Sequence, residues 1–135
     1  IVVYKNHIIV YIRRDSMTMS VREIFYKVEK HLLKQNERSL KTSDSGSGCM
    51  YRSNGGLSCA VGCLMTDDIY RPSFEGESVR DSSIMEALTP IVGVNKDKRV
   101  LKLFLLRELQ KVHDEGSVVD WAGGLAKIKH DFDIS

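Results

Sequence analysis

The chain has 135 residues, of which 42% are hydrophobic and 28% are charged, and its formal net charge is +2. A chain of this length makes one domain that buries on the order of two thirds of its unfolded surface, so its core needs no metal or disulfide. The apolar runs are far shorter than the roughly 20 residues of a membrane span, and no charged leader precedes a long apolar segment. We therefore expect neither a membrane-spanning nor a secreted protein.

Charge is unevenly spread along the chain. Residues 1–52 hold ten Lys and Arg against five Asp and Glu, whereas residues 53–135 hold ten against thirteen, so the two parts carry about +5 and −3. No nucleic-acid-binding module accompanies the basic part, so we favour a solvated helix face over a nucleic-acid partner. Phosphate binding is the alternative role for its basic side chains, which are Arg13, Arg14, Arg22, Lys27, Lys30 and Lys34.

The first part of the chain predicts a strand and then a helix. Residues 2–12 are rich in β-branched and aromatic side chains, which favours one strand or a short hairpin. Ser20 and Glu23 have the spacing of a capping box, and apolar residues follow at helical intervals, which predicts a helix over residues 21–35. Residues 36–56 are rich in Ser, Gly, Asn and charged side chains, which is typical of a loop within one domain.

The middle of the chain predicts a β-hairpin. The step Asn54-Gly55 suits the positive backbone angles of a tight turn, so residues 49–59 are expected to form a short hairpin. The apolar run over residues 59–65 either continues the strand or begins a buried helix, because periodicity does not decide so short a run.

The second half of the chain is helical in outline. A short helix is expected over residues 82–89, because the residue before Pro90 avoids helical angles. A segment rich in leucine, from a cap at Asn95 or Asp97 to Gly116, predicts a central helix that is buried on more than one side. A last helix shows apolar side chains at helical intervals, namely Trp121, Leu125, Ile128 and Phe132.

Together these elements predict the α+β class. Residues 17–135 are expected to form one helix-rich domain with three to four helices and a short β-hairpin at about residues 49–59. Residues 1–16 are expected to be an N-terminal extension, either a strand or a non-native leader.

Cysteine is the residue type whose placement invites a chemical role. Cys49, Cys59 and Cys63 cannot all pair within one chain, and nothing indicates an oxidising compartment, so we expect reduced thiols in a cytoplasm. With His31 they offer four ligands, but a zinc site is usually marked by two close Cys or His pairs, and this group has one. We therefore expect no cofactor and three cysteines buried as small hydrophobes, with zinc as the alternative.

A catalytic cysteine is a second hypothesis. A thiolate nucleophile is favoured by a helix start and by a neighbouring imidazole, which in turn needs an orienting carboxylate. Cys59 follows a glycine-rich turn, which makes it the candidate nucleophile, with His113 as base and Asp114 or Asp120 as the orienting acid. Neighbours on a helix diverge by about 100°, which makes Asp114 the poorer partner for His113.

The most specific motif of the chain is Tyr51-Arg52 followed by Gly56-Leu57-x-Cys59-Ala60-x-Gly62-Cys63-Leu64. With this motif, about residues 19–133 resemble a group of small uncharacterised proteins encoded by phages and prophages. The resemblance carries no assigned activity. It implies that Met17 or Met19 is a natural start. Further segments that fit it are residues 31–35, 67–70, 74–76 and 109–114.

The resemblance also implies a setting inside a bacterial cell, where small phage proteins often bind and block a host machine. We therefore favour a host-takeover or anti-defence protein, such as an anti-CRISPR, that binds a host protein or complex in the cytoplasm and is not an enzyme. Its contact surface is expected around residues 36–58, with Tyr51, Arg52 and Asn54, because Tyr and Arg are enriched at binding hot spots. The alternatives are a hydrolase or acyl-transfer enzyme that uses Cys59 and His113, and a zinc-stapled module.

Overall fold

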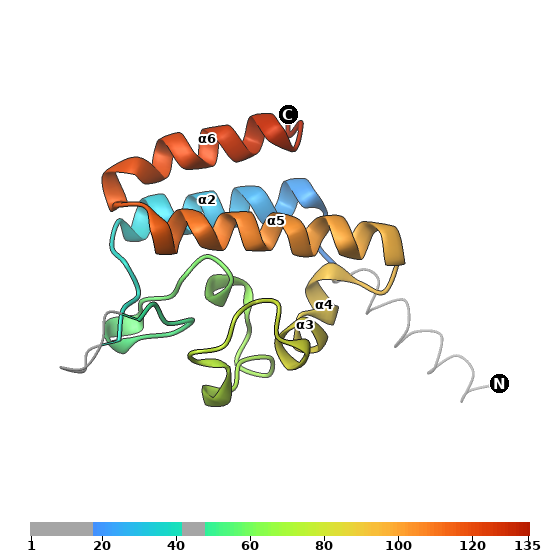
Figure 1. The fold of residues 1–135 in the computed structure, drawn as a ribbon, viewed down its shortest axis with the longest axis horizontal. Helices are drawn as coiled ribbons and strands as arrows, with labels where there is room; N and C mark the ends of the chain where they lie inside the picture. The colour runs from blue at the N-terminus through green and yellow to red at the C-terminus, as the bar shows by residue number, and fades with distance from the viewer. Residues whose placement is uncertain (1–17, 42–47) are drawn as a thin grey trace.

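Three long helices form one layer of the fold in the computed structural model, which describes residues 18–41 and 48–135 (Figure 1). These helices are α2 (Val21–Gln35), α5 (Lys96–Glu115) and α6 (Trp121–Asp131), and each contacts the other two. An irregular segment, formed by the described residues 36–41 and 48–81, and two short helices lie below them in Figure 1. The short helices are α3 (Ser82–Ala87) and α4 (Thr89–Val92), and 3₁₀ turns occur at Asn54–Gly56, Gly62–Leu64, Pro72–Phe74 and Val118–Asp120.

The helix predicted over residues 21–35 is confirmed, and its cap explains why it begins there. The Ser20 hydroxyl accepts a hydrogen bond from the Glu23 amide at 3.1 Å, and the Glu23 carboxylate accepts one from the Ser20 amide at 3.1 Å. This reciprocal pair satisfies two amides that have no partner within the helix. The helix ends at Asn36, which has the left-handed backbone angle φ of 50°.

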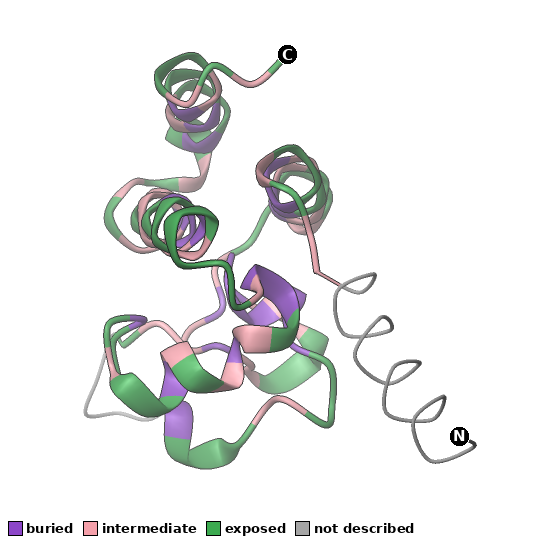
Figure 2. Cartoon of the chain, turned by 90° about the vertical axis from the view of Figure 1, so that its right-hand side faces the viewer, coloured by how far each residue is buried: buried purple, intermediate pink, exposed green. Residues whose placement is uncertain are grey.

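Helix α5 lies between the other elements of the described part of the chain, as its leucine content predicts. Leu105, Leu106 and Leu109 are fully buried against α2 and α6. Figure 2 shows the buried faces of the long helices turned toward one another. The neighbouring helices do not cover the apolar surface of α5 completely, because Leu101 and Phe104 are 48% and 44% exposed on the same helix.

The predicted α+β class is wrong. In the described residues 61% are helical and none belongs to a β-strand. The expected hairpin over residues 49–59 is reduced to a single antiparallel bridge between Arg52 and Ser58 across the turn at Asn54–Gly56, and a second isolated bridge joins Leu40 to Cys49. Residues 59–65 form neither the strand nor the α-helix expected of them but a 3₁₀ turn over Gly62–Leu64. The N-terminal strand expected in residues 1–16 lies outside the described residues.

Glu75 explains why the hairpin does not form. Its two carboxylate oxygens accept hydrogen bonds from the consecutive backbone amides of Tyr51 and Arg52, at 2.8 and 3.0 Å. In a strand, successive amides point in opposite directions and one of each pair serves the neighbouring strand. Because one carboxylate binds both amides, neither is free for a partner strand, and pairing is limited to the Arg52–Ser58 bridge with its two flanking bonds, from the Ser53 amide to Leu57 and from the Cys59 amide to Tyr51. The Tyr70 hydroxyl donates a third bond to Glu75 at 2.6 Å.

The region before α5 also differs from the prediction. Pro90 does not end a helix over residues 82–89 but lies in the first turn of α4, where its missing N–H costs nothing. Helix α3 stops earlier, at Ala87. In the described residues no helix is long and apolar enough to cross a membrane.

The Glu75→Gln variant should destabilise the fold by about 1.5–3 kcal/mol, because hydrogen bonds to a charged acceptor are worth this much and the amide offers one acceptor where two donors need one each. Urea unfolding followed by circular dichroism measures the loss. Glu77→Gln is the control, because the Glu77 side chain is exposed and should change stability by no more than about 0.5 kcal/mol. Equal stability of the two variants would contradict the role of Glu75.

Gly62→Ala should destabilise the protein by about 1–3 kcal/mol or prevent folding, because a Cβ atom there would lie on the carbonyl group of Tyr51. Gly123→Ala is a control within an exposed part of α6. A Cβ at Gly123 meets nothing within 4 Å, so it should stabilise the helix by about 1 kcal/mol. Thermal melting of both variants tests the pair, and a Gly62→Ala protein as stable as wild type would refute this packing.

Candidate functional site

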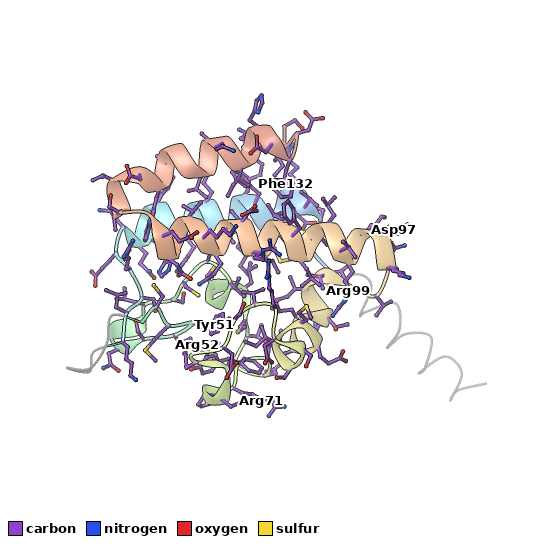
Figure 3. All side chains as sticks on the ribbon, in the orientation of Figure 1. Tyr51, Arg52, Arg71, Asp97, Arg99 and Phe132 are labelled. Atoms are coloured by element: carbon purple, nitrogen blue, oxygen red, sulfur yellow. The ribbon has the colours of Figure 1, made fainter. Side chains whose placement is uncertain are left out.

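A cleft of about 630 Å³ lies between the irregular segment and the C-terminal half of α5. Its walls include Cys49 and Tyr51 from the irregular segment and Gln110 and Asp114 from α5. Clefts of this size hold small ligands, and three candidate residues from the sequence, Cys49, Tyr51 and Asp114, line it. Figure 3 shows how the side chains of Tyr51 and Arg52 lie in the irregular half.

Cys49 and Asp114 line this cleft, and the buried His113 lies next to them. One possible metal-ligand atom from each of the three residues lies within 4.8 Å of those from the other two. In the described part of the chain, this is the one group of three His, Cys, Asp or Glu residues with such spacing. The Asp114 carboxylate accepts hydrogen bonds from His113 Nδ1 at 2.7 Å and from Gln110 Nε2 at 3.1 Å. The predicted divergence of His113 and Asp114 is therefore wrong. Nδ1 lies close to the helix backbone, and the short Asp114 side chain reaches it.

Both ring nitrogens of His113 are engaged. Nε2 accepts a hydrogen bond from the Ser39 amide at 3.0 Å, so it carries the lone pair, and Nδ1 therefore carries the proton that it donates to Asp114. The buried ring also stacks on Trp121 of α6, with 5.5 Å between the ring centroids. A base or metal ligand needs a free lone pair, and in this arrangement His113 has none to offer. Its bonds join α5, α6 and the segment that follows α2.

The three thiols are held in the protonated form. Burial and the adjacent Asp114 carboxylate raise the pKa of Cys49 to about 11. Burial raises the pKa of Cys59 and of Cys63 to about 12 each. The Cys59 sulfur accepts a bond from the Gly62 amide at 3.4 Å, and the Cys63 thiol donates to the Ala60 carbonyl at 3.1 Å. A nucleophilic thiolate would require pKa shifts in the opposite direction.

The structure brings together only part of each predicted set. It places Cys49 rather than Cys59 beside His113 and Asp114. The zinc set of Cys49, Cys59, Cys63 and His31 does not form a cluster of ligand atoms among the described residues. His31 instead lies at Ser58, with Nε2 2.9 Å from the Ser58 carbonyl oxygen.

The predicted contact residues Tyr51 and Arg52 make bonds within the chain. Tyr51 is 6% exposed, and its hydroxyl donates to the Glu77 carbonyl at 2.7 Å. The Arg52 guanidinium donates to Asp67 and to the Met65 carbonyl, each at 2.8 Å, and it lies over the Tyr70 ring.

Asn54, the third predicted contact residue, lies in the 3₁₀ turn over Asn54–Gly56 and is exposed. Its role as a contact residue stays a prediction. Tyr51 and Arg52, in contrast, form hydrogen bonds within the irregular segment.

Sequence reasoning missed an apolar groove between α5 and α6. It has a volume of about 730 Å³, and Leu101, Phe104 and Ile128 contribute to its lining. The rings of Phe104 and Phe132 pack across it with 5.5 Å between centroids. The signal was present in the sequence, because the leucine-rich segment of α5 is apolar over more of its circumference than two neighbouring helices cover.

Comparison with known proteins adds no assignment. No protein family, no curated protein and no solved structure matches the chain.

The thiols should react slowly with iodoacetamide at pH 7.5, about two orders of magnitude more slowly than a free cysteine, because the thiolate fraction falls tenfold for each unit by which the pKa rises. The rate should rise with pH to a midpoint near 11, with Cys49 reacting first. Mass spectrometry of the alkylated peptides measures each site, and protein unfolded in urea is the control. A thiol with a midpoint below pH 8 would revive the hypothesis of a cysteine enzyme.

Proposed function

We propose that the protein is a binding protein that docks onto a host protein through the groove between α5 and α6. The observation that carries the proposal is the exposure of large apolar side chains beside this groove. Val100, Leu101 and Phe104 are 65%, 48% and 44% exposed, although they share a helix with the core. Apolar side chains gathered in this way beside a hollow are typical of protein-binding surfaces.

The charges around the groove favour an apolar segment of the partner. Lys111 pairs with Glu108 at 3.4 Å, and Lys127 pairs with Asp131 at 2.7 Å, so four of the charged residues that line the groove compensate one another. Asp133 is the fifth, and it is exposed. A partner that inserts apolar side chains between Phe104 and Ile128 would bury the groove without leaving an unpaired charge of its own inside it.

The resemblance to phage-encoded proteins supports a bacterial host protein as the partner and the host cytoplasm as the location. An anti-defence protein, such as an anti-CRISPR, is the form of this function that we favour. The position of the surface differs from the expectation from the sequence, because Tyr51 and Arg52 are engaged within the chain.

The alternatives have less support. A hydrolase or acyl-transfer enzyme needs a thiolate and a free imidazole, whereas burial raises the pKa of Cys59 and both nitrogens of His113 are engaged. A zinc-stapled module needs its ligand atoms in one cluster. Cys49, Cys59, Cys63 and His31 do not form such a cluster among the described residues, and His31 Nε2 lies 2.9 Å from the Ser58 carbonyl oxygen.

Leu101→Glu and Phe104→Glu should each abolish capture of a partner from a bacterial host lysate, because each places a charge on the apolar surface. Both side chains are about half exposed, so the fold should persist, and circular dichroism checks this. Quantitative mass spectrometry should find a host protein that wild type retains and that both variants retain at least about tenfold less, as expected for loss of a hot spot.

Val119→Glu is the matched control, because Val119 is 87% exposed and lies outside the groove. It should retain the same host protein as wild type. The captured protein, once purified, should bind wild type and Val119→Glu in calorimetry and should not bind Phe104→Glu. If no retained protein distinguishes the groove variants from Val119→Glu, the proposal is wrong.

A further inference from the structure

Two arginines that line the cleft beside Cys49 lack the hydrogen bonds by which several other arginines stabilise the fold. The guanidinium groups of Arg80 and Arg107 make no hydrogen bond or ion pair with any of the residues described, although both line this cleft. Arg107 is partly buried and lies over the Phe104 ring, 5.7 Å from its centroid. Guanidinium groups elsewhere donate to atoms of the chain, as those of Arg22, Arg38, Arg52 and Arg99 do.

The other charges of the cleft do not compensate these two. The Asp114 carboxylate already accepts bonds from His113 and Gln110, and Lys111 pairs with Glu108. Glu77 and Glu115 also line the cleft, and neither side chain forms an ion pair with Arg80 or Arg107.

Arg107 is partly buried, its guanidinium has no bonded anion among the described residues, and its nitrogens remain open to the solvent of the cleft. A guanidinium has five N–H donors, and an acid group that replaced this water would accept charge-assisted hydrogen bonds from them. An anion in the cleft would supply the missing acceptors to Arg107 and to Arg80.

The rest of the cleft suits the apolar body of a small molecule. Tyr51 and Val79, each 6% exposed, contribute to its wall, and the volume of about 630 Å³ exceeds what an inorganic ion needs. Gly48 and Gly76 also line it, and a Cβ atom at either position would meet nothing within 4 Å. These glycines leave open space at the wall.

We propose that this cleft binds a small organic anion, with its carboxylate or phosphate group at Arg80 and Arg107 and its apolar body against Tyr51 and Val79. Arginine forms bidentate bonds with both kinds of acid group. The inference goes beyond the proposed function, because the cleft shares only Lys111 with the lining of the groove between α5 and α6.

Titration of ¹⁵N-labelled protein at constant ionic strength tests the proposal, with phenyl phosphate, benzoate and benzyl alcohol as probes. Phenyl phosphate or benzoate should cause saturable shifts of the amides of residues 76–80 and 110–115, and the tighter of the two identifies the acid group. Benzyl alcohol, which has the ring without the charge, should cause none. Arg107→Gln should weaken the binding at least about tenfold, because a charge-assisted bond is worth more than 1.4 kcal/mol.

Arg71→Gln is the control, because Arg71 is exposed, makes no ion pair among the described residues and does not line the cleft. It should change the dissociation constant by no more than about twofold, and Leu101→Glu should also leave anion binding intact if the two functions are separate. The proposal is overturned if neither anion causes saturable shifts, or if Arg71→Gln weakens binding as much as Arg107→Gln. The spectrum of each variant without a probe shows whether it is folded.

Discussion

The irregular segment has no β-sheet among its described residues to pair its buried backbone amides and carbonyls. Side chains from other elements form hydrogen bonds with these groups instead. A buried amide or carbonyl without a partner costs about as much as a lost hydrogen bond. Gln35 of α2 binds both the amide and the carbonyl of Ser58, at 3.1 and 2.9 Å, and Gln110 of α5 accepts the Val61 amide at 3.0 Å. With Glu75, these residues attach the irregular half to the helices.

The same demand explains why residues that look functional in the sequence serve the fold. His113 binds the Ser39 amide and stacks on Trp121, so an imidazole that resembles a catalytic base joins three elements. Arg52, a residue type common at interfaces, donates to the Met65 carbonyl. The candidates for function are instead side chains that the fold leaves partly exposed or without a hydrogen-bond partner among the described residues. Helix α5 carries two of them in contact, the exposed Phe104 of the apolar groove and Arg107 in the cleft.

The chemistry of the cysteines follows from where they are buried. All three lie in surroundings that disfavour the thiolate, and the carboxylate nearest to Cys49 raises its pKa further. Burial thus acts against the nucleophilic role that the glycine-rich turn before Cys59 suggested. The cleft has a thiol and a carboxylate in its wall and an imidazole buried next to them, which are the residue types of a catalytic site, but the thiol is protonated and both imidazole nitrogens are engaged.

Local signals were enough to predict the long helices of this protein. The capping box at Ser20 and Glu23 and the apolar periodicity of α5 act within one or two turns, so the sequence by itself determined them. The tertiary structure decided the hairpin, because the amides of Tyr51 and Arg52 bind a carboxylate more than twenty positions away. It also placed Cys49 rather than Cys59 beside His113, and left Phe104 exposed. The groups that a fold leaves exposed or without a bond depend on all of its tertiary contacts, so no local sequence pattern predicts them.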